Sequence, residues 1–291
     1  MKYLYTMRFK VYSSLSYEVI AKTAFIFNIQ AAKTASQKII SESITVVPAV
    51  PFEEFSLSNS ETRFIKMEAE QGIHFTITYQ AEVELNYLLI HQETLASSVS
   101  IIDLNHEVLP FINPSRHCES DKLLDFAHQE FGHLSSQYAK VSAINEWIFN
   151  TIAYKTGSTN SNASACDTLL YKEGVCKDFA HLGIALSRAL DIPARYFTSY
   201  AYALNPPDFH ACFESYIGGK WLFFDPTQLS VANGLVKIAN GMDASEVAVA
   251  SYFGEVKCTF MKIDCQVINS DFIAFDSDSN SKKVISYDAL S

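Results

Sequence analysis

The sequence predicts an α+β protein in which a β-sandwich-like domain precedes a domain of helices packed on an antiparallel sheet. Up to about residue 115 the chain consists of β-branched and aromatic runs broken by Ser, Asn, Pro and Gly, a pattern typical of short strands. Beyond that point apolar residues recur at helical spacing. A long helical pattern at 175–190 is then followed by three strand-like runs, and Gly218-Gly219 between the last two indicates a hairpin.

The first domain, predicted to span residues 1–115, contains several strands in succession. The clearest runs are 9–12, 24–29, 44–47 and 73–79. Apolar and polar side chains alternate along the last of these, which is typical of a strand with one solvent-facing side. Such a series predicts a small antiparallel sandwich. Its histidines (His74, His91 and His106) are scattered and indicate no site.

Residues 116–234 are predicted to form the second domain. Helices are expected at 120–131, at 141–152, in a short segment that Ser164 and Asp167 cap, and at 175–190. Strands are expected at 194–202, 209–217 and 220–224. We expect residues 235–291 to be a C-terminal extension that packs on the core or on the N-terminal domain.

Composition limits the function classes. A chain of 291 residues, 48% of them hydrophobic, can bury a large core. Its net charge of −10 and pI near 5.3 argue against nucleic acid as a partner. We find no stretch long enough for a membrane span and no secretory signal pattern, so we expect a cytoplasmic protein without a membrane partner. Six cysteines are too sparse for a disulfide scaffold, and the oligomeric state is left open.

Three residues form the candidate catalytic group. Cys176 follows Gly174 at the start of the fourth helical pattern, where the free N–H groups of a helix stabilise a thiolate and can bind an oxyanion. His210 and Asp225 lie on the two arms of the predicted hairpin, at similar distances from its turn, so a cross-strand or diagonal contact between them is expected. A thiol, a base and a carboxylate that orients the base are what a cysteine nucleophile needs.

The same residues carry a family resemblance. The blocks Gly174-Val175-Cys176-Lys177-Asp178-Phe179-Ala180, Asp191-Ile192-Pro193-Ala194-Arg195-Tyr196, His210-Ala211 and Asp225-Pro226-Thr227 resemble the core of the transglutaminase-like superfamily. The resemblance implies a papain-like fold in which Cys176 is the nucleophile, His210 the base and Asp225 its orienting partner.

The bacterial two-part version of this family, described as transglutaminase-like cysteine proteases, fits the rest of the chain. The N-terminal strands resemble its β-rich leading domain, and residues 241–247 resemble its segment after the core. Cys212 is a departure, since the family often has Trp at that position.

We therefore expect a thiol-dependent amide or peptide-bond hydrolase that forms a thioester on Cys176, with a peptide or protein as its substrate. One alternative is a protein-glutamine acyltransferase, that is, a transglutaminase, because water and an amine can attack the same thioester. Another is a non-catalytic binding module on the same fold. Tyr200, Trp221 and Arg195 are weak candidates for substrate contacts, since a structural role suits each of them better.

No cofactor and no metal site are expected. His128 and His133 do not share a helix face. Residues 276–281 begin like a calcium-binding loop, but the sixth position lacks Gly and Tyr287 stands where the final Glu should be.

Overall fold

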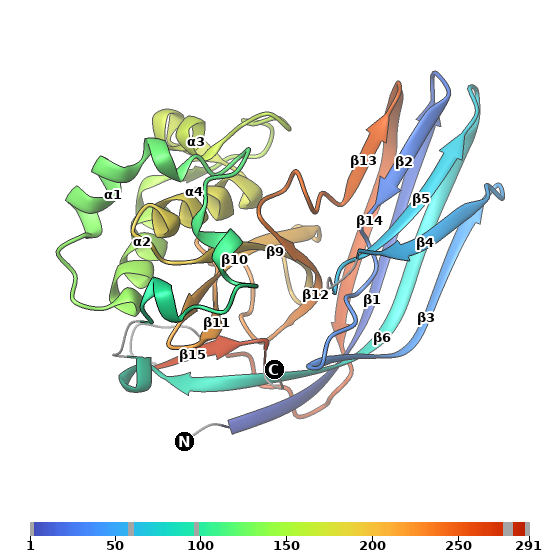
Figure 1. Cartoon of the computed structure of the whole chain (residues 1–291). Coiled ribbons are helices and arrows are strands. Elements are labelled where there is room, and N and C mark those ends of the chain that lie inside the picture. The colour runs from blue at the N-terminus through green and yellow to red at the C-terminus, as the bar shows by residue number, and fades with distance from the viewer. Residues whose placement is uncertain (1–2, 58–60, 96–98, 276–281, 289–291) are drawn as a thin grey trace.

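The computed structural model describes residues 3–57, 61–95, 99–275 and 282–288. Helices gather on one side of the molecule and long strands on the other, with a small sheet between them (Figure 1). The mixed α+β class predicted from the sequence is confirmed, with a β-rich domain preceding the helical core. The calcium-like segment at 276–281 lies outside the described residues.

The N-terminal domain consists of two antiparallel sheets. One has the order β14-β1-β6-β15, with β3 also paired to β6, and the other has the order β13-β2-β5-β4. The strands are β1 (Tyr3–Val19), β2 (Thr23–Phe27), β3 (Gln37–Val47), β4 (Phe52–Ser56), β5 (Arg63–Ala69), β6 (His74–His91), β13 (Ala250–Phe253), β14 (Val256–Val267) and β15 (Lys283–Ser286). Rings of Tyr17, Phe25 and Phe75 pack together between the two sheets, with centroids 5.2–5.7 Å apart. This packing confirms the sandwich.

The C-terminal extension does not form a separate layer. β13, β14 and β15 are strands of the two N-terminal sheets, so the sandwich is completed by residues far along the chain. β12 (Leu235–Gly241) pairs with β9 and is the fourth strand of the core sheet, although it begins after the predicted end of the core at residue 234. The extension thus packs on both domains, and it does so by strand pairing.

The core places its helices on a sheet of order β11-β10-β9-β12. Its strands are β9 (Ala194–Ala201), β10 (Phe209–Ile217) and β11 (Lys220–Phe224), and a short parallel pair is formed by β7 (Ala153–Tyr154) and β8 (Glu173–Gly174). The helices are α1 (Leu124–Phe131), α2 (Gln137–Thr151), α3 (Ala165–Tyr171) and α4 (Cys176–Arg188). Short 3-10 turns are η1 (Gln92–Leu95), η2 (Ile101–Asp103), η3 (Leu109–Ile112) and η4 (Ser120–Lys122).

Local signals explain most of these boundaries. The capping box of Ser164 and Asp167 at the start of α3 is confirmed. α2 begins at Gln137, earlier than predicted, because the Ser136 hydroxyl accepts a hydrogen bond from the backbone N–H of Ala139 at 3.1 Å. The predicted hairpin is also confirmed: Gly218 and Gly219 have φ of 60° and 79°, the left-handed conformation that a two-residue turn requires.

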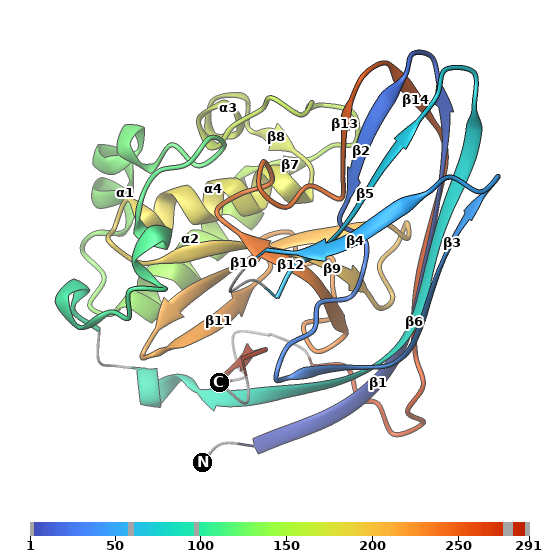
Figure 2. The ribbon, with the colours of Figure 1, turned by 45° about the vertical axis from the view of Figure 1, so that its right-hand side comes forward.

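The two domains meet at a buried polar contact. The Tyr200 hydroxyl from β9 donates to the carbonyl of Ile29 at 2.5 Å and contacts the Ser13 hydroxyl at 2.9 Å. Its ring also stacks on that of Tyr79 from β6. In Figure 2, β1 and β6 run below the core sheet before they curve upward into the sandwich. The core is therefore held between its own helices and the long N-terminal strands.

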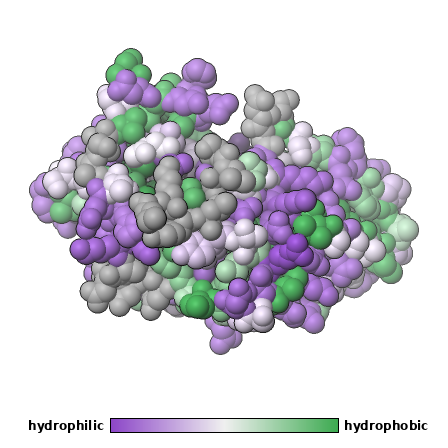
Figure 3. All heavy atoms as spheres, turned by 90° about the horizontal axis from the view of Figure 1, so that it is seen from below, coloured by the Kyte–Doolittle hydropathy of each residue, from purple (hydrophilic) through white to green (hydrophobic). Residues whose placement is uncertain are grey.

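The face seen in Figure 3 is mostly hydrophilic, and the apolar residues visible on it form small separate groups. Among the described residues, no helix has the length and apolar character that crossing a bilayer requires.

The close approach of α4 to β10 depends on Gly183. A Cβ atom at this position would lie 2.6 Å from a ring carbon of Phe213, a side chain that is fully buried and stacked on Phe224. Alanine favours a helix by about 1 kcal/mol over glycine, while overpacking costs about 1–3 kcal/mol. We expect Gly183→Ala to lower the free energy of unfolding by on the order of 1–2 kcal/mol, measured by urea denaturation.

The double variant with Phe213→Leu is the control. Leucine vacates the space that the new methyl group needs, so Gly183→Ala should cost much less in this background. An equal cost in both backgrounds would show that the packing contact is not the cause.

Candidate active site

Cys176 is the first residue of α4, and the sequence around it fixes the start of the helix. The Asp178 carboxylate accepts a hydrogen bond from the backbone N–H of Val175 at 2.9 Å, which caps the helix. Gly174 is required here because a Cβ atom would lie 2.7 Å from the Cβ of Asp178. Cys176 itself remains partly exposed, so its thiol stands at a helix N-terminus within reach of solvent.

The short β7–β8 pair brings Tyr154 beside this helix start. Tyr154 pairs with Gly174, and the backbone N–H of Lys155 donates to the carbonyl of Gly174 at 2.9 Å. The Tyr154 ring packs on Phe179 with centroids 5.8 Å apart. Burial raises the pKa of Tyr154, the neighbouring Cys176 sulfur raises it further, and a hydrogen bond to the backbone of Cys176 opposes them. Tyr154 was not predicted as a site residue. The feature of the sequence that could have indicated it is an aromatic hydroxyl in the strand directly after α2.

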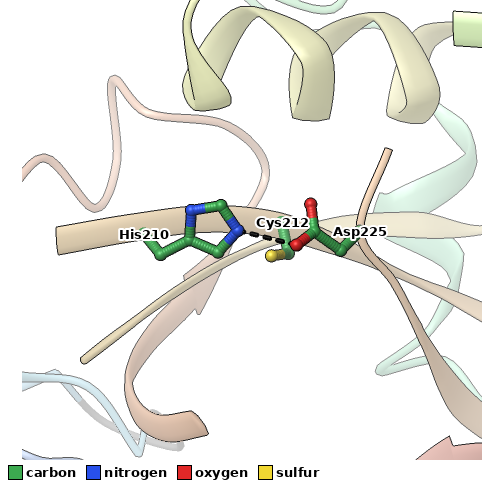
Figure 4. A group of neighbouring side chains, drawn as sticks. All are labelled: His210, Cys212 and Asp225. Carbon is green, nitrogen blue, oxygen red and sulfur yellow. Dashed lines mark hydrogen bonds and ion pairs between the residues drawn. The ribbon is translucent and has the colours of Figure 1, made fainter. Parts of the chain in front are cut away.

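His210 and Asp225 come together as the hairpin predicts. The Nε2 atom of His210 lies 2.8 Å from the carboxylate of Asp225, and both residues are buried (Figure 4). Phe213 pairs with Phe224 in the β10–β11 register, which puts Asp225 across from Cys212 and diagonal to His210. The contact therefore follows from the register of the hairpin.

The Asp225 carboxylate is held by the turn that follows β11. One oxygen accepts hydrogen bonds from the Thr227 N–H at 3.0 Å and hydroxyl at 2.7 Å. The other accepts from the Ser230 N–H at 3.2 Å and hydroxyl at 2.6 Å, in addition to His210. Neither Thr227 nor Ser230 was predicted as a partner of the carboxylate. For Thr227 a local indication exists, because a hydroxyl two residues after an aspartate is common in turns.

Electrostatics favour the ion pair. Burial lowers the pKa of His210, but the Cys212 sulfur, the Asp225 carboxylate and a hydrogen bond with Cys176 together raise it well above its ordinary value of 6.5. Burial raises the pKa of Asp225, yet His210, Ser230 and Thr227 bring it well below the ordinary range. Because Nε2 faces Asp225, the Nδ1 atom of the imidazole is left for Cys176. A thiol at a helix start thus contacts a charged, oriented imidazole.

Cys212 is the unexpected neighbour of this pair. It is fully buried on β10, and burial together with the Asp225 charge raises the pKa of its thiol to about 12. Ligand atoms of His210, Cys212 and Asp225 all lie within 4.8 Å of one another. The position of Cys212 next to the imidazole was not predicted from the sequence.

The three weak candidates for substrate contacts have structural partners. Tyr200 is buried at the domain contact. Arg195 pairs with Glu214 at 2.6 Å and with Asp288 at 3.0 Å, and its guanidinium lies over the Trp221 ring at 4.1 Å from the centroid. The buried positions of Tyr200, Trp221 and Arg195 agree with the structural role that the sequence favours for each of them, and substrate contact by these residues stays a prediction.

His181 lies apart from the candidate group, because it follows Cys176 by five residues on α4 and so points about 140° away from it round the helix. Its ring stacks between His117 and Tyr196, with centroids 5.0 Å from each. The Nε2 atom accepts a hydrogen bond from the backbone N–H of Ala244 at 3.2 Å. Burial, followed by the neighbouring His117, lowers the pKa of His181 to about 3. A histidine held neutral in this way supports the fold and cannot act as the base.

A buried His–Asp pair beside a helix-start cysteine defines a thiol-nucleophile site on a helix-on-sheet core. Comparisons with known proteins agree. Residues 7–107 match the family described as bacterial transglutaminase, N-terminal domain, and residues 125–226 match the transglutaminase-like superfamily. The crystal structure of a protein described as a putative cysteine protease from Cytophaga hutchinsonii is 48% identical, covers 99% of this chain and 100% of that one, and superposes with a TM-score of 0.96. The chain belongs to the transglutaminase-like superfamily.

Curated relatives are more distant. The uncharacterized protein ML0607 of Mycobacterium leprae is 26% identical over 163 residues, which are 53% of this chain and 57% of that protein. Rv2569c of Mycobacterium tuberculosis, also uncharacterized, is 42% identical over 60 residues, or 21% of this chain and 19% of that protein. The chain thus matches little more than half the length of the first and a fifth of the second.

The buried His181 makes stability depend on pH. The folded protein protonates it only near pH 3, whereas the unfolded chain does so near 6.5. Between these values the unfolded chain binds more protons, so stability falls as pH falls, by up to about 1.4 kcal/mol per pH unit. The pKa of His210 is raised instead, so its stabilisation is fully present below the unfolded value and is lost only as pH rises above it, outside this window.

We expect His181→Gln, which keeps a polar acceptor for the Ala244 N–H, to lose less stability than the wild type as the pH falls below 6.5. The measurement is the free energy of unfolding by urea at several pH values between 6.5 and 4. A variant that loses stability as steeply as the wild type would contradict the assignment.

Proposed function

We propose that this protein is a thiol-dependent amide or peptide-bond hydrolase in which Cys176, His210 and Asp225 are the catalytic residues. The observation that carries the proposal is the buried contact of His210 with Asp225 at 2.8 Å, with the Cys176 thiol near enough to help raise the pKa of the same imidazole. Family membership and the similar cysteine protease from Cytophaga hutchinsonii support an enzyme of this class.

In the proposed reaction, the Cys176 thiolate attacks the carbonyl carbon of the substrate. The helix-start N–H of Cys176 and the Tyr154 hydroxyl stabilise the oxyanion of the tetrahedral intermediate. The His210 imidazolium then donates its proton to the leaving amine, and a thioester remains on Cys176. A water that gives its proton to His210 attacks the thioester and releases the acid. Asp225 holds the imidazole orientation throughout.

The buried ion pair argues against a binding module. Removing an imidazole and a carboxylate from water carries a desolvation cost of several kcal/mol, which the direct contact and the four hydrogen bonds to Asp225 offset. A protein that only binds a partner gains nothing from an oriented, charged imidazole beside a thiol. Acid–base chemistry does use one.

A polar hollow of about 380 Å³ lies on the surface near the nucleophile helix. Neither Cys176 nor His210 lines it, so it is not the reaction centre itself. Two of its lining residues lie close to the start of α4: Glu173 is in the strand just before Cys176, and Thr159 donates a hydrogen bond to Asp178 at 3.2 Å. We propose that it accepts a polar part of the substrate. Its lining is Ser158, Thr159, Asn160, Asn162, Ala163, Asp167, Thr168, Tyr171 and Glu173.

Replacement of Cys176 tests the function. In the wild type, a thiol-directed acyl probe should label one cysteine at neutral pH, and Cys176→Ala should abolish that labelling. Among the other five cysteines, Cys212 also lies beside the imidazole but is fully buried, and burial raises the pKa of Cys118 and Cys212 to about 12. Peptide mass spectrometry identifies the labelled residue. Undiminished labelling of the variant would refute the proposal, and an added amine that outcompetes water for the thioester would favour the acyltransferase.

Tyr154→Phe tests the proposed oxyanion contact. The ring and its packing on Phe179 are retained, so only the hydroxyl is lost. Because loss of one oxyanion donor costs about 10²–10³-fold in kcat, we expect a fall of about 10²-fold at an unchanged KM. The measurement is steady-state hydrolysis of an amide substrate that the wild type turns over. A change confined to KM would assign Tyr154 to substrate binding instead.

A further inference from the structure

We propose that His210, Cys212 and Asp225 form a zinc-binding site, and that Zn²⁺ bound there reversibly blocks the thiol chemistry. A metal site at these residues was not expected from the sequence. Among the described parts of the chain, these three residues are the one group of histidine, cysteine and acidic side chains close enough to share an ion. The binding itself is independent of the proposed function, while its inhibitory consequence rests on that function.

Backbone geometry brings the three donors together. His210 and Cys212 are two residues apart on β10, so their side chains leave the same face of the strand. The β10–β11 register places Asp225 across from Cys212. Figure 4 shows the imidazole and the carboxylate facing each other, with the Cys212 sulfur beside the carboxylate. The cluster is thus fixed by strand pairing and does not depend on a flexible loop.

The donor set is the one that zinc prefers. Imidazole nitrogen, thiolate sulfur and carboxylate oxygen bind Zn²⁺ at about 2.0–2.3 Å, commonly as three protein ligands with a fourth position left for water. Tetrahedral ligands at those lengths stand roughly 3.5 Å apart. The donors here lie within 4.8 Å of one another, so small side-chain rotations suffice.

Charge balance also favours a divalent cation. A Cys212 thiolate and the Asp225 carboxylate together neutralise Zn²⁺, which satisfies the requirement that buried charges be paired or bound to metal. On binding, the thiol proton of Cys212 and the proton on Nε2 of His210 are released to water. The Thr227 and Ser230 hydroxyls already orient the carboxylate, as partners of metal ligands commonly do.

The cluster lies beneath an exposed turn. The turn after β11 covers it, and Gln228 and Leu229 in that turn are exposed. Ser230, in the same turn, is the residue that holds the Asp225 oxygen facing His210. Zinc on Nε2 would replace the His210–Asp225 hydrogen bond, so the imidazole could no longer exchange protons with Cys176 and the leaving group. Metal and catalysis are therefore mutually exclusive in this arrangement.

The test uses the full chain carrying Cys176→Ala, which removes the nucleophile as a competing ligand and makes activity irrelevant. Co²⁺ replaces the spectrally silent Zn²⁺. We expect one Co²⁺ per chain with a thiolate-to-cobalt charge-transfer band, and displacement of Co²⁺ by Zn²⁺. Adding Cys212→Ser should abolish the band and weaken binding by at least about tenfold. Adding Cys118→Ser, at another fully buried cysteine, should leave the charge-transfer band and the Co²⁺ affinity unchanged.

Asp225→Asn is a second, nearly isosteric variant that guards against misfolding of the Cys212 variant. In the Cys176→Ala background it should keep the sulfur band but bind Co²⁺ at least about tenfold more weakly. Absence of the band in Cys176→Ala, its persistence after Cys212→Ser, or unchanged affinity after Asp225→Asn would each overturn the proposal.

The inhibitory consequence is tested separately in the protein that retains Cys176. Zn²⁺ should slow alkylation of Cys176 by iodoacetamide, a chelator should restore the rate, and Cys212→Ser should make the rate insensitive to Zn²⁺. Because alkylation needs no substrate, it remains informative even if no hydrolysis is found. Equal protection of Cys176 by Zn²⁺ in the Cys212→Ser variant would place the metal on Cys176 itself and overturn the inference.

Discussion

The buried contact between His210 and Asp225 is the constraint that the rest of the core must satisfy. Two charged groups removed from water are stable only if geometry and hydrogen bonding are close to ideal. The hairpin with its two glycines sets the register, and the turn after β11 supplies Thr227 and Ser230 to the remaining carboxylate positions. Disturbing either one would leave a buried charge without a partner, which is far more costly than losing an exposed ion pair.

The sheet that carries this pair is held in place from both sides. α4 packs closely enough on β10 for its N-terminus to bring Cys176 to the imidazole, and Gly183 makes that approach possible. On the other side, Tyr200 ties β9 to the N-terminal domain, while β15 from the end of the chain pairs with β6 of the same domain. The N-terminal sandwich is therefore part of the support of the site, because the core sheet would lose one of its two packing surfaces without it.

Local signals allowed much of this arrangement to be predicted from sequence. The capping box at Ser164, the glycine pair of the hairpin and the helical periodicity of α4 each act over a few residues, and each is present as expected. The pairing of β13, β14 and β15 with strands far away in the chain was not predicted, because no local pattern specifies a partner. The partners of Arg195 and Tyr200 were not predictable for the same reason, since Asp288 and Ile29, which hold them in the interior, are distant in sequence.

The candidate site was predictable to the extent that it depends on one hairpin and one helix start. Cys176 and the diagonal contact of His210 with Asp225 follow from these two elements alone. Tyr154 and Cys212 required the fold: the first reaches the site through the parallel β7–β8 pair, and the second is significant only because of the register across from Asp225. Cys212 places a sulfur beside the imidazole, and this sulfur changes the chemistry available there. The Cys212 thiol can bind a cation together with Asp225. The same strand pairing that orients the base thus brings a sulfur ligand to it, and this explains why the proposed catalysis and metal binding meet at one imidazole ring.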